Sequence, residues 1–519
     1  MNMQDQRAVL AFLTDPSSYG DPTLRIHTKP THISVIIFVG SRVLKLKRAV
    51  RLPYVDFSTV DKRLEACERE LILNRRTAPG LYIAVRRITL DAEGHLMFDG
   101  QGTLLDAVVE MVRFDEDTLF DRLAVQGRLT PVALTQLART IAHFHADADV
   151  ALDHAGAARM AAVLDTNAKS LASSGLFPYE TIASLTTGLW RSFDEHVPLL
   201  NARARAGKVR RCHGDMHLRN ICMVEGIPTL FDCMEFDETL ATIDVLYDLA
   251  FLLMDLWYRG LEPEANLVFN RYLDECDEAD GLALLPFFMS LRATIRAHVT
   301  VEQALQTTSQ ERDGLVDEAM SYAALALRLL TPAPASLVAI GGLSGTGKSS
   351  VAAAIAHKIG SAPGARILAS DRIRKRSYGV VAETRLPERA YEPEISAHVY
   401  ATLAQNAQKI LASDHGVVAD AVFDLPIERQ RIEDTATDSG VRFTGFWLYA
   451  QPDQLLSRVE QRVGDPSDAT AEVVRAQLAS DIGRPTWFRI DAGGNIDNTV
   501  AQVTQVLGER SATFSQSLA

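Results

Sequence analysis

The sequence predicts two unlike parts, an α+β part at the N-terminus and an α/β part with a parallel sheet at the C-terminus. The chain has 519 residues, which exceeds the roughly 100 to 200 residues of a typical single domain. Prolines in residues 331–336 (TPAPAS) end a helical stretch rich in Ala and Leu, just before an apolar run. We therefore expect a linker at 331–336, domains at 1–330 and 337–510, and a tail at 511–519.

In the N-terminal part, residues 33–47 predict two strands joined by a Gly-Ser turn, and residues 57–74 predict a charged amphipathic helix. A sheet with one helix is therefore expected as a small lobe over about residues 20–110. From about residue 111 to 330 the pattern is mostly helical. At residues 208–237, glycines and a proline separate short apolar segments and interrupt the helical pattern. We expect the reactive site of the N-terminal part to lie there.

The C-terminal part contains short apolar runs separated by helical segments. The runs are LVAI, ARILAS, GVVADAVF and FTGFWLYA. This alternation is typical of βαβ units, which build a parallel sheet with helices on both faces.

Composition and charge limit the classes of partner. Apolar residues make up 47% of the chain and charged residues 23%, which is ordinary for a globular protein and excludes a disordered or fibrous chain. The formal net charge of -13 argues against a nucleic acid or an anionic membrane as the general partner, although a local basic patch is still compatible with it.

Cysteine use and the apolar runs bear on localisation. The five cysteines form no CxxC pair, and such a sparse, odd set indicates a reducing cytoplasm. The first residues lack the basic and long apolar regions of a secretory signal. The longest apolar stretches, residues 34–40 and 249–253, are much shorter than the about 20 residues of a membrane helix. We expect a cytoplasmic protein without a membrane span.

Residues 342–349 (GLSGTGKS) match the phosphate-binding pattern G-x-x-x-x-G-K-[ST] between an apolar run and a predicted helix at 350–359. Glycines let successive backbone N–H groups point at phosphates, and the helix N-terminus favours an anion. Lys348 is expected to reach the β- and γ-phosphates, and the hydroxyl of Ser349 to bind Mg²⁺. The predicted nucleotide contacts are Gly342, Ser344, Gly345, Thr346, Gly347, Lys348, Ser349 and Ser350.

Two aspartates follow predicted strands of the C-terminal part, at the edge where α/β sheets bind ligands. Asp371 is a candidate to accept the proton of an attacking hydroxyl, with a helix N-cap as the alternative. Asp420 is a candidate to hold Mg²⁺ or its water, with an ordinary strand-end aspartate as the alternative. Arg458 and Arg462 share a helix face and could close over a transferring phosphoryl group, with a solvated basic face as the alternative.

Over about residues 337–510, the chain resembles the small P-loop kinases, the group that includes gluconate kinase, chloramphenicol phosphotransferase, zeta toxins and polynucleotide 5'-kinase. The resemblance rests on residues 342–349 and on the aspartate after the second strand. It implies that Asp371 contacts the acceptor hydroxyl. Asp371 and Arg374 also match the Asp-x-x-Arg spacing of polynucleotide kinases and zeta toxins, so an RNA end or a nucleotide sugar stays open as a substrate.

In the N-terminal part, residues 213–220 (HGDMHLRN) place Asp215 and Asn220 at the Asp-x-x-x-x-Asn spacing of a kinase catalytic loop. Twelve residues after Asn220, a short apolar stretch ends at Asp232. This segment resembles the aminoglycoside phosphotransferase and choline kinase class, whose HGD-x-x-x-x-N loop is followed by an aspartate on the next hairpin. The resemblance implies that Asp215 is the base and that Asn220 and Asp232 are Mg²⁺ ligands.

A zinc site is the alternative for this region, because Cys212, His213, His217 and Cys222 cluster in the sequence. Their spacing is not that of a common zinc module, which favours the kinase interpretation. Asp248, at the head of an apolar helical stretch, is expected to be a structural cap or loop anchor.

Lys45 and Lys47 lie on one face of a predicted strand, and either could contact phosphates. Lys45 is the first choice, with Glu70 on the following helix to orient it. No G-x-G-x-x-G segment precedes these lysines, since KPTHIS stands at residues 29–34. A strand with exposed basic residues is therefore the alternative.

The order of these segments resembles a bacterial family of bifunctional proteins that fuse an aminoglycoside-phosphotransferase-like domain to a P-loop kinase of the AAA family. VLKLKRAV, HGDMHLRN, YDLAFLLMDL and GLSGTGKSS are among the segments that carry the resemblance, which covers nearly the full length. It implies a bilobal, protein-kinase-like N-terminal domain. Because the family label concerns the fold, it does not identify aminoglycosides as the substrate.

We therefore expect a phosphotransferase that uses ATP, or GTP in its place, with Mg²⁺ and a small-molecule hydroxyl acceptor. Its P-loop domain is expected to be the active kinase, joined to a second kinase-like unit that is active or degenerate. One alternative is a regulatory protein that hydrolyses ATP and carries a degenerate kinase-like binding module. The other is a polynucleotide or nucleotide-sugar kinase.

Overall fold

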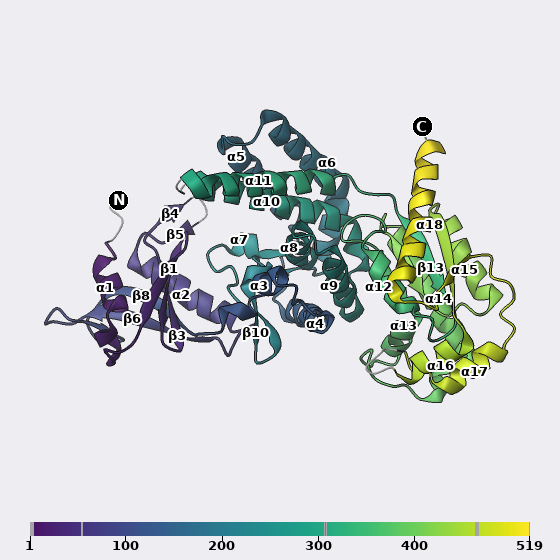
Figure 1. Ribbon diagram of the computed structural model, residues 1–519. Helices are drawn as coiled ribbons and strands as arrows, with labels where there is room; N and C mark the ends of the chain where they lie inside the picture. The colour runs from purple at the N-terminus through teal and green to yellow at the C-terminus, as the bar shows by residue number, and fades with distance from the viewer. Residues whose placement is uncertain (1–4, 53–54, 306, 308, 462–466, 518–519) are drawn as a thin grey trace. The chain divides into compact units, whose positions relative to one another are not determined.

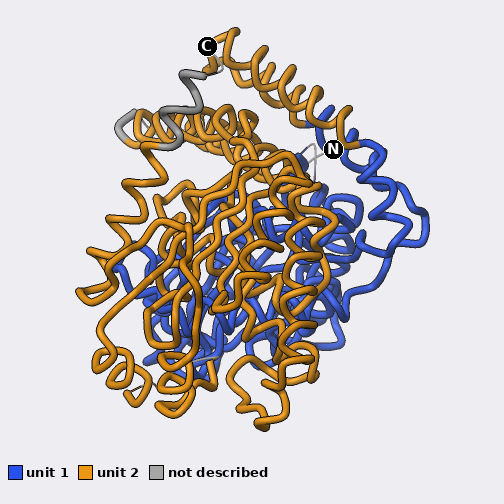
Figure 2. The backbone as a smooth tube through the Cα atoms, turned by 90° about the vertical axis from the view of Figure 1, so that its right-hand side faces the viewer, with its two compact units in different colours: residues 1–166, 197–255 blue, residues 167–196, 256–519 orange. Residues whose placement is uncertain are grey.

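The computed structural model describes residues 5–52, 55–305, 307, 309–461 and 467–517 (Figure 1). The chain divides into two compact units (Figure 2). Unit 1 consists of residues 1–166 and 197–255, and unit 2 of residues 167–196 and 256–519. Unit 2 therefore contains helices that precede the expected linker, together with the C-terminal part.

Unit 1 contains a six-stranded antiparallel sheet in the order β1-β2-β3-β8-β6-β7. The predicted strand pair at residues 33–47 is present as β2 and β3, which meet at a turn where Gly40 has a φ of 56°. The bounds are β1 Ile26–Pro30, β2 Ser34–Val39, β3 Arg42–Lys47, β6 Tyr82–Leu90, β7 Leu96–Phe98 and β8 Thr103–Val112.

Both faces of this sheet are covered, because its side chains alternate between two clusters. Phe38 and Val43 pack with Cys67 of α2 (Val60–Asn74). Ile37 and Leu44 face the other way, in the cluster that contains residues of α1 (Arg7–Thr14). Helix α2 confirms the predicted amphipathic helix and begins three residues into it, after the N-cap Thr59. The apolar side of α2 thus packs against this face of the sheet.

The remainder of unit 1 is largely helical, as the sequence predicts. Two small antiparallel ladders interrupt the helices within residues 208–244, β9 with β12 and β10 with β11. The elements are α3 Phe120–Val125, α4 Pro131–Asp147, α5 Gly156–Ser173, α6 Tyr179–Arg205, β9 Val209–Arg211, β10 Ile221–Val224, β11 Ile227–Leu230, α7 Glu238–Ala241, β12 Thr242–Asp244 and α8 Val245–Tyr258, with α5, α6 and α8 continuing into unit 2.

Unit 2 contains helices α9, α10 and α11 before the expected linker, and after it a five-stranded parallel sheet in the order β14-β15-β13-β16-β17. The expected linker connects the last of these helices to β13. The bounds are α9 Glu262–Glu275, α10 Leu285–Leu305, α11 Ser309–Leu329, β13 Ser336–Gly341, β14 Arg366–Ala369, β15 Val417–Asp420, β16 Arg442–Tyr449 and β17 Phe488–Asp491.

Helices follow the strands of this sheet, which confirms the predicted βαβ pattern. Val338 and Ile340 of β13 pack in one core cluster with side chains of α12 and α18. Leu337 and Ala339, which point to the other face of the sheet, are also fully buried. A strand that is buried on both faces has a continuous apolar sequence, as residues 337–340 (LVAI) do. The helices are α12 Lys348–Ala356, α13 Ser370–Ser377, α14 Pro393–Leu411, α15 Pro426–Asp438, α16 Pro452–Glu460, α17 Ala471–Ala479 and α18 Ile496–Ser517.

A search of the described helices finds none that is both long enough and apolar enough to cross a membrane.

Candidate phosphoryl-transfer sites

The P-loop of unit 2 has the backbone that its glycines predict. Gly342 has a φ of 141° and Gly345 a φ of 91°, a region that side chains with a Cβ rarely adopt. A Cβ on Gly342 would lie 2.4 Å from the carbonyl oxygen of Leu448, and one on Gly345 would lie 2.7 Å from that of Leu455. Helix α12 begins directly after the loop, at Lys348. The backbone of the loop therefore packs too closely against Leu448 and Leu455 for a side chain at Gly342 or Gly345, and the loop leads directly into the N-terminus of α12.

Side chains of the loop are held by local hydrogen bonds. Thr346 Oγ1 donates to the carbonyl of Leu343 at 2.8 Å, and Lys348 Nζ lies 3.2 Å from the same oxygen. Ser344 is buried, whereas Ser349 and Ser350 are exposed in the first turn of α12. An exposed hydroxyl at that position is open to a metal ion.

Helix α17 contributes a contact that sequence reasoning missed. The backbone N–H of Ser344 donates to Oε1 of Gln477, at 2.9 Å. This N–H belongs to the set that a P-loop offers to phosphates. Gln477 lies 133 positions further along the chain, in a helix without a recognisable motif, so no local signal could have identified it.

Strand register brings the two predicted aspartates to the same edge of the sheet as the P-loop. Asp420, at the end of β15, pairs with Ile340 of β13 on one side and with Ala369 of β14 on the other. The P-loop follows β13, and Asp371 lies two residues beyond Ala369. Because the strands are parallel, all three features lie at the carboxyl edge, where α/β sheets bind ligands.

Asp371 lies in the first turn of α13, next to a group of aromatic and basic side chains. The N-cap of α13 is Ala369, so Asp371 is not the N-cap residue that the sequence left as an alternative. Arg374 is buried, donates to the carbonyl of Ala390 at 2.6 Å and lies 4.7 Å from the ring centre of Tyr391. Burial raises the pKa of Tyr391 and Tyr400, and the charge of Asp371 adds to both shifts.

The predicted arginine pair is only partly described. Arg458 of α16 lies against the P-loop, with Nη1 3.5 Å from the carbonyl oxygen of Gly345. Arg462 lies outside the described residues. Beyond that gap, the carboxylate of Asp468 accepts hydrogen bonds from Lys375 Nζ and Tyr391 Oη, both at 2.6 Å. Asp468 is therefore attached to α13, the helix that carries Asp371, through Lys375.

In unit 1, one lysine joins three parts of the predicted kinase-like site. Lys45 Nζ, on β3, donates to Oε1 of Glu70, on α2, at 2.8 Å. It also contacts the carboxylate of Asp232, which follows β11. The Lys45 side chain is 12% exposed, so the alternative of an exposed basic strand is wrong. Asp232 has a φ of 63°, a conformation that is uncommon for a residue other than glycine.

Lys47 is buried beside Lys45 and pairs with two carboxylates, those of Glu70 and Glu235. Burial disfavours the charged form of Glu70, yet Lys45 and Lys47 outweigh it and lower the pKa of this carboxyl. Burial and the neighbouring carboxylates raise the pKa of Glu235. Lys47 is thus part of an internal ion-pair network rather than an exposed phosphate contact. The sequence shows that Lys45 and Lys47 share a strand face, but it does not indicate that Glu235, 188 positions away from Lys47, is their neighbour.

The predicted catalytic loop is connected to this network through the backbone. Asn220 Nδ2 donates to Oδ2 of Asp215 at 2.8 Å, which leaves the amide oxygen of Asn220 as its potential metal ligand. The backbone N–H of Phe231, next to Asp232, donates to the carbonyl of Asn220 at 3.0 Å. Asp215, Asn220 and Asp232 are thereby placed in one region, and carboxylate and amide oxygens are suitable ligands for Mg²⁺.

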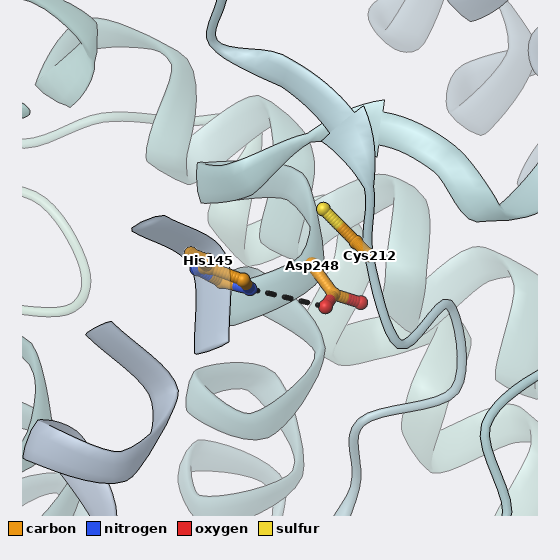
Figure 3. A group of neighbouring side chains, drawn as sticks. All are labelled: His145, Cys212 and Asp248. Atoms are coloured by element: carbon orange, nitrogen blue, oxygen red, sulfur yellow. Dashed lines mark hydrogen bonds and ion pairs between the residues drawn. The ribbon is translucent and has the colours of Figure 1, made fainter. Parts of the chain in front are cut away.

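Asp248 of α8 anchors the predicted catalytic loop, as the sequence predicts. Its carboxylate accepts hydrogen bonds from the backbone N–H groups of His213, at 3.0 Å, and Gly214, at 2.9 Å. His145 Nε2 lies 3.2 Å from the same carboxylate, and Cys212 lies beside the pair (Figure 3). Burial raises the pKa of the Cys212 thiol well above its ordinary value. These contacts indicate a structural anchor, and of the four residues considered for the zinc alternative the cluster contains Cys212 alone.

Two known families match separate segments of the chain. A phosphotransferase enzyme family matches residues 55–285, and an AAA domain family matches residues 337–480. The chain fuses a phosphotransferase-family domain to an AAA-family P-loop domain. The match to the phosphotransferase-family domain includes residues 213–220 and begins after β3. The predicted fusion and its fold class are confirmed.

Known proteins match this chain over different shares of its length. Uncharacterized proteins of Mycobacterium tuberculosis and Mycobacterium bovis are each 27% identical over 492 residues, which cover 93% of this chain and 95% of the relative. A gluconokinase structure from Sinorhizobium meliloti is 22% identical and covers 36% of this chain and 97% of its own, with a TM-score of 0.26. A choline/ethanolamine kinase family structure from Mesorhizobium loti is 12% identical and covers 62% of this chain and 98% of its own, with a TM-score of 0.38.

Proposed function

We propose that the protein is an ATP- and Mg²⁺-dependent phosphotransferase that phosphorylates a hydroxyl group of a small molecule at its P-loop site. The main support is the shared sheet edge, where the P-loop, Asp420 and Asp371 come together. A phosphate cradle, a candidate metal carboxylate and a candidate base are the parts that phosphoryl transfer requires. GTP is the alternative nucleotide.

The roles at the P-loop site follow from the chemistry of each group. Lys348 and the loop N–H groups bind the β- and γ-phosphates, and Ser349 and Asp420 hold Mg²⁺, which neutralises phosphate charge. Asp371 orients the acceptor hydroxyl and accepts its proton as the bond to phosphorus forms. Arg458, which already touches the loop at Gly345, stabilises the charge of the transferring group. We also retain Arg462 in that role on the basis of its spacing in the sequence.

The phosphotransferase-family domain supplies a second site, which we propose also binds nucleotide. The pair of Lys45 and Glu70 supports this role, because a lysine held by a carboxylate is oriented toward phosphates in kinases. Asn220 and Asp232 would hold Mg²⁺, and Asp215 would be the base. The strands that carry the lysine lack a glycine-rich loop, so we expect this nucleotide to be held mainly through the metal and Lys45.

Product analysis tests the proposed function. The full chain is incubated with γ-labelled ATP, Mg²⁺ and a library of small hydroxyl compounds, with Lys348→Ala as the control. A labelled small molecule formed by the wild type but not by the control supports the proposal. Release of ADP and phosphate alone would favour an ATP-hydrolysing regulatory protein. A labelled 5' end on added RNA would favour a polynucleotide kinase.

A further inference from the structure

The parallel sheet of unit 2 has an edge strand, β14, directly before the segment that carries Asp371. On its inner side β14 pairs with β15, and the N–H of Arg366 donates to the carbonyl of Gly416 at 2.9 Å. Successive residues of a strand point their backbone groups to opposite sides. The carbonyl of Ala365 and the N–H of Ile367 therefore lie on the outer side, where a sixth strand would pair.

Helix α9 occupies that outer side through a fully buried asparagine. Asn270 Oδ1 accepts the N–H of Ile367 at 2.7 Å, and its Nδ2 lies 3.2 Å from the carbonyl oxygen of Ala365. A neighbouring strand would offer one acceptor and one donor at these same two positions. Asn266, one turn earlier, also donates to the carbonyl of Ala365, at 3.1 Å. The two amide side chains replace the backbone of a missing strand.

A carboxylate one turn further along α9 extends this contact past the end of β14. Asp274 accepts from Arg366 Nη2 at 2.7 Å and from Arg372 Nη1 at 3.1 Å. Arg372 is the residue directly after Asp371. Burial disfavours the charged form of Asp274, yet Arg366 and Arg271 outweigh it and lower the pKa of this carboxyl. An ionised carboxylate therefore joins α9 to both sides of the strand-to-helix turn that contains Asp371.

We infer that α9, which lies within the phosphotransferase-family domain, completes the acceptor side of the P-loop site by holding the β14–α13 turn in place through Asn270 and Asp274. The inference rests on the proposed function of that site and adds two positioning residues to it. Neither residue is assigned a contact with the substrate. They act through Ile367, Arg366 and Arg372, which flank Asp371 along the chain.

Polar contacts of this kind define a position more closely than apolar packing does. An apolar helix face could also cover an edge strand, but it would leave the N–H of Ile367 buried without an acceptor. Asn270 fixes the position of α9 along β14, because its amide donor and acceptor match one pair of backbone groups, the carbonyl of Ala365 and the N–H of Ile367. A displacement of the turn by about 1 Å can lower a rate by about 100-fold when the base lies on it.

The test uses the full chain in an Asp232→Ala background, so that nucleotide turnover is measured at the P-loop site alone. Asn270→Leu removes the hydrogen bonds of the amide to the backbone of Ala365 and Ile367 and to the Arg366 side chain. Asp274→Asn is a milder change that removes the charge while keeping the shape. Glu264→Gln is the matched control, because it removes a carboxylate from the first turn of the same helix. The measurements are ADP formation from Mg²⁺ and ATP with water as the acceptor, ATP affinity by calorimetry, and backbone hydrogen exchange.

We expect Asn270→Leu and Asp274→Asn to lower kcat by about 10- to 100-fold while the affinity for ATP stays at the level of the control. Hydrogen exchange should rise in residues 366–377 and remain unchanged in β13. Unchanged exchange in residues 366–377 would overturn the inference. A rise that extends to β13 with a parallel loss of ATP affinity would also overturn it, since it would indicate general loosening. A wild-type protein that neither binds nor turns over ATP would instead count against the proposed function.

Discussion

Lys45 Nζ lies 2.8 Å from Oε1 of Glu70 and also contacts the carboxylate of Asp232. One ammonium group thereby links the sheet, helix α2 and the segment after β11. Glu70 is fully buried, so this arrangement is not a solvent-screened surface pair. The carboxylates and lysines around it form a compact charged site, which we expect to bind a metal ion together with the phosphates of a nucleotide.

Removal of Asp232 tests whether this site is active. In a Lys348→Ala background, we expect the protein to retain Mg²⁺-dependent nucleotide binding and to lose it when Asp232→Ala is added, because lysines alone do not replace the metal. Calorimetric titration with ATP and Mg²⁺ measures both steps. Glu225→Gln, in the exposed turn between β10 and β11, is the control. Equal binding with and without Asp232 would show that the site does not use this carboxylate.

Lys348→Ala should remove most nucleotide binding at the P-loop while the fold is preserved. Lys348 provides charge to phosphate, and its contact with Leu343 is a single hydrogen bond to a carbonyl. In the Asp232→Ala background, titration isolates this site, and the thermal unfolding midpoint checks the fold. Retention of full affinity would mean that residues 342–349 are not the phosphate site.

Asp371→Asn should lower phosphoryl transfer far more than it lowers ATP affinity. A general base assists mainly in the transition state, and its loss costs about 10²- to 10⁴-fold in rate. The measurement is the initial rate with an acceptor found by the library screen, alongside an ATP titration. A rate close to that of the wild type would place the acceptor elsewhere.

Glu428 should make the stability of unit 2 depend on pH in a specific direction. Burial and the nearby Asp424 raise the pKa of Glu428 from 4.5 to about 7. Between these values the unfolded chain releases a proton that the folded protein keeps, so stability falls as the pH rises. Glu428→Gln should remove this fall. From pH 5 to pH 8, the free energy of unfolding of the variant should therefore rise by about 1 to 2 kcal/mol relative to that of the wild type. The expected difference is kept this small because solvent screens part of the effect.

Urea denaturation at the two pH values measures this difference. Glu388→Gln, an exposed carboxylate in the same domain, is the control and should show no such gain. A gain that is the same at pH 5 and pH 8 would contradict the assignment, because it would be independent of ionisation.

Asp248→Ala should destabilise unit 1 and disorder the catalytic loop. The change leaves the buried N–H groups of His213 and Gly214 without their acceptor, which costs about 1 to 3 kcal/mol for each group. Thermal unfolding measures the loss, and added zinc distinguishes an anchor from a metal site. Stabilisation of the wild type by zinc, absent in Asp248→Ala, would contradict the structural role.

Local signals in the sequence were sufficient for several elements of the fold and the P-loop site. The P-loop is contiguous, and Gly342 and Gly345 are required there by the backbone itself, so its position between a strand and a helix could be predicted. Asp420 and Asp371 could be placed at one sheet edge, because parallel strands align their carboxyl ends. The pair of Lys45 and Glu70 could be suggested because β3 and α2 are close in sequence.

By itself, the sequence determined the two kinase-like parts and the conformation of the loop at residues 342–349, and it indicated where two candidate sites lie, since each depends on contiguous patterns and on strand alternation. Only the tertiary structure decided which side chains hold those sites in place. Glu235 meets Lys47 across 188 positions, and Asn270 meets Ile367 across 97. Such contacts depend on how helices and strands pack, and a buried amide or carboxylate is retained only where packing provides a partner for it.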